Sequence, residues 1–343
     1  MDSLSTVRHW VVVYLLAFLF SWLYILKFLI EVWKHRNSKE SSTIKEAPSC
    51  LNNPDFGTHQ TVTLKGQYNL NIHYVANGLR EKPLMLFLHG FPDFWYGWRY
   101  QLKEFSKDYY AVAIDLPGYG ESSKPDEVSK YSKEELARDV KEFITELGYS
   151  SCVLVGHDWG GIISYKFAAD YPEMVDKLII INSPHPAAFR KGMKTLKQLL
   201  MSSYIFFFQL PCIPDYMLSA GGAASLDGLR DEKVFKNIEN FTEEDLKAYK
   251  FTFQRGGFTG PLNYYRMLFE IPKVKPVRMQ MTMPSIIIWG VDDRALGTSL
   301  ATLSSNYFDQ VELKYIDRAS HWPHVDQPET VNKHISEFLQ QTE

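Results

Sequence analysis

The stretch Val153-Leu154-Val155-Gly156-His157-Asp158-Trp159-Gly160-Gly161 decides the fold. Its apolar start, rich in valine, predicts a buried strand, and residues 162–169 after it have the apolar spacing of a helix. Glycines between the two let strand and helix approach closely around one residue at a strained backbone angle. The pattern is Gly-x-nucleophile-x-Gly with Asp158 in place of the more usual serine, which favours a carboxylate nucleophile. The alternative is that Asp158 caps the helix that follows.

Length and composition limit the class of protein. A chain of 343 residues, of which 45% are hydrophobic, suits one large globular domain or a domain with an insertion. A net charge of -3 provides no basic field for nucleic acid, so we predict no nucleic-acid partner. The three cysteines lie far apart without the spacing of zinc ligands, at Cys50, Cys152 and Cys212. We therefore expect no disulfide framework and no metal.

The N-terminal segment is long and apolar. Trp10 to Leu26 carries no charge, and the apolar character resumes after Lys27 as far as Trp33, which together reaches the roughly 20 residues needed to cross a bilayer. The segment is apolar all round, and charged residues follow it where a cleaved signal peptide would have small ones. We therefore predict that residues 1–36 form an uncleaved membrane anchor. Its aromatic side chains suited to the membrane interface are Trp10, Trp22, Tyr24 and Trp33.

The charges around the anchor predict its orientation. Four positive residues follow the anchor and one precedes it, so the positive-inside rule places the main domain in the cytosol. The four are Lys34, Arg36, Lys39 and Lys45, and the one before the anchor is Arg8. The acceptor sequence Asn240-Phe241-Thr242 would be glycosylated only if that domain faced the lumen. Residues 37–56 are predicted to be a polar linker, too poor in apolar side chains to pack.

Strand and helix signals alternate over the remaining chain, residues 57–343. An opening hairpin and further strands are predicted at 61–64, 70–75, 84–88, 111–116, 177–181, 285–289 and 311–316, and helices at 133–147 and 330–339. Residues 187–275 contain helical stretches without a convincing strand. The pattern therefore predicts an α/β domain with a mostly parallel sheet, flanking helices and an inserted helical lid.

Residues after two of these strands complete a candidate catalytic set. Ligand sites in open α/β sheets lie beyond the carboxyl ends of the strands. There the sequence has the adjacent acids Asp292 and Asp293, and it has His321 in the loop after the next strand. The order nucleophile, acid, histidine is that of α/β-hydrolases. A lone loop histidine is more often an ordinary surface or core residue, but strand context and chain order both favour a catalytic His321.

Five motifs occur along this domain, three in its core and two in the predicted lid. They are His89-Gly90-Phe91-Pro92, Asp115-Leu116-Pro117-Gly118-Tyr119-Gly120, the stretch around Asp158, Tyr204-x-x-x-Phe208-Gln209-x-Pro211, and Gly260-Pro261-Leu262-Asn263-Tyr264-Tyr265-Arg266. With these motifs the chain resembles the epoxide hydrolases of the α/β-hydrolase fold, particularly the membrane-anchored animal group of epoxide hydrolases 3 and 4. The resemblance covers residue 57 to the end. Pro117 departs from it, because many relatives carry arginine there.

The resemblance implies a two-step reaction that consumes no cofactor. Asp158 would attack an epoxide carbon and form an ester, while the lid tyrosines Tyr204 and Tyr265 hydrogen-bond the epoxide oxygen and donate a proton. His321, held by an acid, would then activate a water that hydrolyses the ester and releases a vicinal diol. The tetrahedral oxyanion would be stabilised by the backbone N–H groups of Phe91 and Trp159.

Several assignments rest on the register of the family. Its Gly-x-x-Asp spacing favours Asp293 over Asp292, and its lid register favours Tyr265 over Tyr264, although a lid aromatic is more often a packing residue. The substrate is expected to lie against His89, Pro92, Trp95, Phe208 and Gln209. The histidines expected to support or line the site without proton transfer are His157, His324 and His89. A cis peptide bond is predicted at Phe91-Pro92, which would aim the Phe91 N–H into the site.

The expected substrate is a lipophilic epoxide, such as an epoxy fatty acid or a related lipid. Residues 204–208, with Met217, Met267 and Phe269, favour an apolar tunnel, and a membrane anchor suits a substrate that partitions from the bilayer. With the resemblance, this predicts an enzyme of the endoplasmic reticulum membrane. Two alternatives stay open. One is a haloalkane or haloacid dehalogenase with the same triad and added halide-stabilising donors, and the other is a non-catalytic hydrolase-like binding protein.

Overall fold

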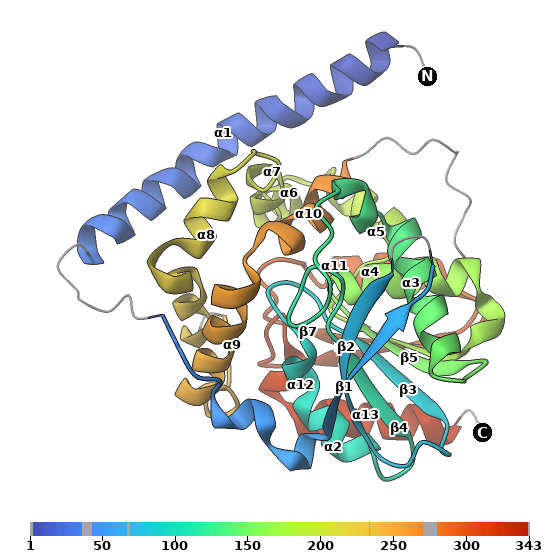
Figure 1. Cartoon of the computed structure of the whole chain (residues 1–343). Coiled ribbons are helices and arrows are strands. Elements are labelled where there is room, and N and C mark those ends of the chain that lie inside the picture. The colour runs from blue at the N-terminus through green and yellow to red at the C-terminus, as the bar shows by residue number, and fades with distance from the viewer. Residues whose placement is uncertain (1–2, 36–42, 67–68, 233, 270–279, 342–343) are drawn as a thin grey trace.

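A central sheet of eight strands organises the molecule (Figure 1). The computed structural model describes residues 3–35, 43–66, 69–232, 234–269 and 280–341. The strands lie in the order β1-β2-β4-β3-β5-β6-β7-β8, and all neighbours from β4 to β8 are parallel, whereas β1–β2 and β2–β4 are antiparallel. Their bounds are β1 (Thr58–Leu64), β2 (Leu70–Asn77), β3 (Leu84–Leu88), β4 (Tyr110–Ile114), β5 (Cys152–His157), β6 (Val175–Ile181), β7 (Ser285–Gly290) and β8 (Val311–Ile316).

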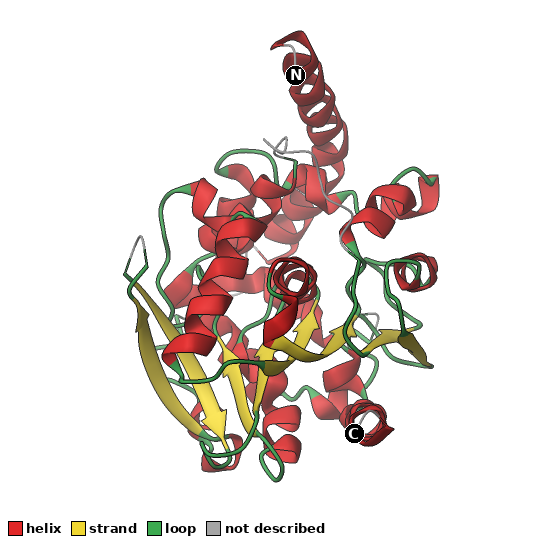
Figure 2. Cartoon of the chain, turned by 90° about the vertical axis from the view of Figure 1, so that its right-hand side faces the viewer, coloured by secondary structure: helices red, strands yellow, loops and turns green. Residues whose placement is uncertain are grey.

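Burial explains why the central strands read as unbroken apolar runs. Every residue of β3, β4, β5 and β7 is buried, as expected when helices cover both faces of a parallel sheet. Helices lie on both sides of the sheet (Figure 2). Among them, α2 (Arg99–Phe105) contacts α13 (Pro328–Gln341), and α3 (Lys133–Glu146) contacts α4 (Trp159–Asp170). In the β3–β5 register Leu88 pairs with Gly156, which sets the loop after β3 beside the turn after β5.

The segment between β6 and β7 forms the predicted lid. Its helices are α5 (Pro186–Gly192), α6 (Leu196–Met201), α7 (Tyr204–Phe207), α8 (Ile213–Ala223), α9 (Glu243–Gly256) and α10 (Thr259–Leu268). Within the described part of 187–275 the lid has no strand, as predicted, and its expected end lies outside the described residues. The remaining helices after β7 are α11 (Ser299–Ser305) and α12 (Pro323–Asp326).

The chain before β1 differs in part from its prediction. Helix α1 (Ser3–His35) is long and apolar enough over Trp10–Ile30 to cross a membrane, which by length and composition is compatible with an anchor. The prediction that residues 37–56 do not pack is wrong for its last part. Two short 3-10 turns form there, Leu51 is buried, and its carbonyl oxygen lies 2.8 Å from His59 Nε2. A few apolar side chains and one backbone hydrogen bond are enough to fix this piece against the domain.

Candidate active site

The turn between β5 and α4 holds Asp158 in an unusual backbone conformation. Its φ of 49° and ψ of -115° lie where side chains are rarely found, and the close approach of strand and helix keeps it there. A Cβ on Gly156 would lie 2.7 Å from the Gly160 carbonyl oxygen, and one on Gly160 would lie 2.7 Å from the His89 carbonyl oxygen. The glycines of the motif are therefore needed for this contact.

The Asp158 side chain does not cap α4, although its backbone occupies the position before the helix. Instead its Oδ1 accepts a hydrogen bond of 2.9 Å from the backbone N–H of Phe91. The Phe91-Pro92 bond is cis, as predicted, and the Phe91 N–H points to the carboxylate. Trp159 begins α4, so its N–H has no acceptor within the helix. These observations remove the capping interpretation and leave an oriented carboxylate.

His321 lies between two carboxylates. Its Nδ1 is 2.7 Å from Asp293 Oδ2, and its Nε2 is 3.5 Å from Asp158 Oδ2. All three side chains are nearly buried, with exposed fractions of 7%, 6% and 8% for His321, Asp293 and Asp158. Burial alone would lower the pKa of His321, but the two carboxylates outweigh it and raise the pKa to about 10.

The structure distinguishes the two adjacent acids after β7. Asp293 Oδ2 also accepts a hydrogen bond of 2.7 Å from Asn182 Nδ2. Its Oδ1 accepts hydrogen bonds of 2.8 Å from the backbone N–H groups of Ala295 and Leu296. Asp292 points away, with its carboxylate 3.4 Å from Lys236 Nζ. Asn182, which follows β6, was missed at the sequence level. Its position directly after a strand of the predicted sheet was the available signal.

Two lid tyrosines, Tyr204 and Tyr265, belong to a group of aromatic side chains next to Asp158. The Tyr265 ring lies 5.0 Å from those of Trp159 and Phe208 and 5.3 Å from that of Phe91. Tyr204 stands 5.9 Å from Tyr265 between ring centres. Burial and then neighbouring charged groups hold the pKa of both hydroxyls well above the ordinary value, so both stay protonated donors.

The neighbouring lid residues have structural roles. The Tyr264 hydroxyl donates 2.7 Å to the Pro117 carbonyl oxygen, so it is already engaged with the core domain. Gln209 Nε2 donates to the carbonyl oxygens of Ile205 and Tyr265 at 3.1 and 2.8 Å. Gln209 therefore links the two tyrosine-bearing segments, and the structure does not support its predicted contact with substrate.

Two further predicted substrate contacts are corrected. His89 is fully buried, with Nδ1 2.9 Å from the Gly90 carbonyl oxygen and Nε2 accepting 3.0 Å from the Leu116 N–H. It braces the loop that carries Phe91. Trp95 packs at 5.1 Å against the ring of His59, and its backbone N–H donates to Asp115. His89 begins the motif His89-Gly90-Phe91-Pro92 and Trp95 lies three residues after it, but both side chains point into the core. Pro92 and Phe208 stay candidates.

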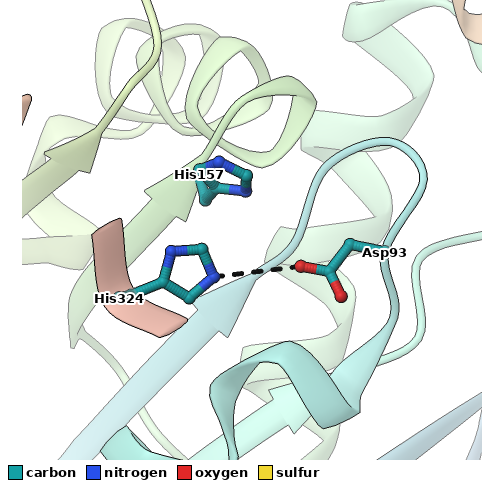
Figure 3. Close-up of side chains that lie close together, drawn as sticks. All are labelled: Asp93, His157 and His324. Carbon is teal, nitrogen blue, oxygen red and sulfur yellow. Dashed lines mark ion pairs between the residues drawn. The ribbon is translucent and has the colours of Figure 1, made fainter. Parts of the chain in front are cut away.

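Asp93, His157 and His324 form a buried cluster (Figure 3). His157 Nε2 donates 2.8 Å to the His321 carbonyl oxygen, and His324 Nε2 is 3.8 Å from Asp93 Oδ2. Burial lowers the pKa of both cluster histidines, so they are neutral. Donor atoms up to 4.8 Å apart would have to close to about 3.3 Å for bonds of zinc length. The cluster supports the His321 loop, and the absence of a metal stays a prediction.

The fold defines the class of protein as an α/β-hydrolase, in which the Asp158 carboxylate occupies the position of a candidate nucleophile, and comparisons with known proteins agree with this fold class. A family model described as alpha/beta hydrolase fold matches residues 83–328. Human epoxide hydrolase 4 is 41% identical over 99% of this chain and 95% of its own length, and Xenopus tropicalis epoxide hydrolase 3 is 40% identical over 87% and 82%. The crystal structure of Bacillus megaterium epoxide hydrolase in complex with an inhibitor has a TM-score of 0.74 and 35% identity, covering 82% of this chain and 100% of that one. The chain belongs to the epoxide hydrolases.

This membership confirms three predictions: the fold, the enzyme class, and the resemblance to epoxide hydrolases 3 and 4. The dehalogenase and the non-catalytic binding protein are not favoured, because the similar proteins are named as epoxide hydrolases. The small-molecule partners of an epoxide hydrolase are an epoxide and water.

Proposed function

We propose that the protein hydrolyses lipophilic epoxides to vicinal diols through an ester at Asp158. The observation that carries this proposal is the orientation of the carboxylate. Oδ1 is held at 2.9 Å by the Phe91 N–H, whereas Oδ2 faces His321 and makes no capping hydrogen bond. A carboxylate fixed in this way has one oxygen available for attack and the other already in place for charge stabilisation.

In the first step, Asp158 Oδ2 attacks an epoxide carbon and the carbon–oxygen bond of the ring breaks. The oxygen that leaves develops negative charge, and the hydroxyls of Tyr204 and Tyr265 stabilise it and provide a proton. The raised pKa of each tyrosine supports this role, because a hydroxyl must hold its proton until the oxygen becomes basic. The product is a hydroxyalkyl ester on Asp158.

In the second step, His321 Nε2 takes a proton from a water that attacks the ester carbonyl carbon. The carbonyl oxygen is Oδ1, so the negative charge of the tetrahedral intermediate forms on the atom already bound by Phe91. The N–H of Trp159 is the second proposed donor. Asp293 accepts from Nδ1 and holds the tautomer that leaves Nε2 able to accept a proton.

The charge on Asp158 controls when His321 can act as a base. In the free enzyme both carboxylates raise the pKa of His321 to about 10, which keeps the ring protonated at neutral pH. Ester formation removes the Asp158 charge, so the pKa of His321 falls and its proton passes to the tyrosinate that ring opening leaves in the lid. The histidine therefore becomes a base only after the ester exists.

The proposed substrates are epoxy fatty acids or related lipids that reach the enzyme from a membrane. Support comes from the aromatic group around Tyr265 and from the apolar helix α1. We propose residues 1–36 as the anchor, the following residues as a connection, and the domain with its lid as the catalytic unit.

The proposed location is the endoplasmic reticulum membrane, with the catalytic domain in the cytosol. The charge asymmetry around the anchor supports this orientation. In the folded domain the Asn240 side-chain amide donates a hydrogen bond of 3.1 Å to the Asp326 carbonyl oxygen. A glycan on Asn240 would contradict the cytosolic orientation.

One turnover in oxygen-18 water tests the mechanism. The full chain reacts with a substoichiometric lipid epoxide, and mass spectrometry follows both the diol and the peptide that carries Asp158. The expected result is solvent label in the Asp158 carboxylate and none in the first diol. Label entering the diol directly would refute the ester. His321→Gln should form the ester and fail to hydrolyse it, so its mass increase provides an independent check.

A further inference from the structure

Helix α1 is packed on one side. Three aromatic side chains lie on that side at helical spacing, and the ring of each contacts an aromatic residue of the lid; they are Phe20, Tyr24 and Phe28. Three smaller side chains on the same side are buried, namely Val13, Ala17 and Ser21. Other apolar side chains of α1 are 42–61% exposed, among them Val11, Tyr14, Leu15, Phe18, Trp22, Leu26 and Ile30. The helix thus has one apolar face against the lid and another free for lipid.

The face that packs meets α7 from outside (Figure 1). The Tyr24 and Ser203 hydroxyl oxygens are 2.9 Å apart, and the Tyr24 ring stacks on Phe207 at 5.1 Å with an interplanar angle of 18°. One turn earlier, Phe20 stacks on Phe206 at 5.8 Å. Tyr24, predicted to suit the membrane interface, therefore packs on the lid. Phe206 and Phe207, expected to line the substrate tunnel, pack against α1 and its surroundings.

The opposite side of α7 forms part of the active site. Tyr204 lies 5.5 Å from Phe208 and 5.9 Å from Tyr265, and Phe208 lies 5.6 Å from Phe91. Helix α7 has four residues, Tyr204–Phe207, and a single turn has little stability of its own. Its position must come from what packs on both sides. Without α1, the outer side of α7 would lose its stacked rings and the hydroxyl contact at Ser203.

We infer that α1 is a positioning element of the catalytic lid, in addition to its proposed role as an anchor. Tyr24 and Phe20 hold α7 against the core domain, and α7 in turn places the Tyr204 hydroxyl over Asp158. The inference rests on the proposed function, because it needs Tyr204 to act on the epoxide oxygen. A shift of about 1 Å in such a group lowers a rate by up to about 10²-fold.

Ring removal from α1 tests the inference, with the full chain in phospholipid vesicles. Tyr24→Ala removes the ring that packs on α7, and Tyr14→Ala is the matched control because Tyr14 is 50% exposed. Single-turnover quench experiments measure ester formation and ester hydrolysis separately. We expect Tyr24→Ala to slow ester formation about tenfold and leave hydrolysis unchanged. Tyr14→Ala should change neither step.

A double-mutant cycle separates positioning from general loosening of the lid. In a Tyr204→Phe background, Tyr24→Ala should cause no further loss, because its effect passes through the missing hydroxyl. A merely structural role would slow both steps and persist in that background. If Tyr24→Ala does not fold, Tyr24→Phe removes only the hydroxyl next to Ser203 Oγ and should slow ester formation a few-fold, with Tyr14→Phe as its control.

The outcomes distinguish the inference from the proposed function. If Tyr204→Phe leaves ester formation at the wild-type rate, the acid role of Tyr204 fails. If Tyr204→Phe slows ester formation while the Tyr24 and Tyr14 variants behave alike, the role of α1 fails and the mechanism stands.

Discussion

The substitution Asp293→Asn gives a sharp test of the site, because it replaces one carboxylate oxygen by an NH2 group and keeps the shape of the side chain. Oδ1 of Asp293 accepts 2.8 Å from the backbone N–H groups of both Ala295 and Leu296. The amide oxygen of the variant must keep these hydrogen bonds, so its NH2 group takes the place of Oδ2. There it faces His321 Nδ1 at 2.7 Å and the Asn182 amide donor at the same distance.

The expected loss follows from the tautomer. An NH2 group donates to Nδ1, so the proton of His321 moves to Nε2, and Nε2 can no longer accept one from water. The corresponding change in a serine triad lowers kcat about 10⁴-fold. We expect the rate constant for ester hydrolysis to fall about 10³-fold to 10⁴-fold, and that for ester formation to fall less than about tenfold.

Rapid quenching with intact-protein mass spectrometry measures both rates, and the ester should accumulate in the variant. Asp292→Asn is the matched control. That carboxylate is partly exposed, 3.4 Å from Lys236 Nζ, and such pairs contribute about 0–1 kcal/mol. Hydrolysis at the wild-type rate in Asp293→Asn, or ester accumulation in Asp292→Asn, would refute the assignment of the acid.

Further predictions concern charge, the lid and the membrane. Asp158→Asn should lower the pKa of His321 from about 10, which an NMR titration of the ring measures. The positive charge of His321 is then lost at a lower pH than in the wild type, and so is the stability that depends on this charge. Tyr265→Phe should slow ester formation, whereas Tyr264→Phe should keep the rate and lower the free energy of unfolding by about 1 kcal/mol, measured by urea titration. Protein purified from animal-cell membranes should show no mass change on glycosidase treatment, and a loss of mass would place Asn240 in the lumen.

The sheet, the turn at Asp158 and the order of the catalytic set could be predicted because they depend on local patterns. A valine-rich run, closely spaced glycines and residues after strand ends each follow from short-range geometry. The choice of Asp293 over Asp292 needed the family spacing, since adjacent residues share the same strand end. The structure then shows one of them bonded to His321 and the other near the surface.

Side-chain direction and packing between distant segments could not be predicted. His89 begins a motif near Asp158 and Trp95 follows that motif, but their hydrogen bonds and ring contacts face the core. Gln209 is committed to lid carbonyl oxygens that come from two separate segments. Asn182 is marked in the sequence only by its position after a strand, and its contact with Asp293 depends on β6 and β7 being neighbours in the sheet.

The contact between α1 and the lid limits how deeply the helix can enter a bilayer. The buried side chains on the lid side of α1 begin already at Val13, about one turn after Trp10, so no stretch long enough to cross the roughly 30 Å of a hydrocarbon core is free on all sides of the docked helix. In a membrane, the docked helix would therefore offer only its outer face to lipid.

The lid surface near α1 is suited to that position, with exposed apolar side chains at Leu196, Leu200, Ile213 and Tyr216. Phospholipid vesicles should then protect α6 and α8 from hydrogen exchange, and the same exchange with and without vesicles would exclude this arrangement. In that arrangement the intramolecular contact between α1 and the lid would set the depth of immersion, and the proposed lipid substrate would reach the lid directly from the bilayer.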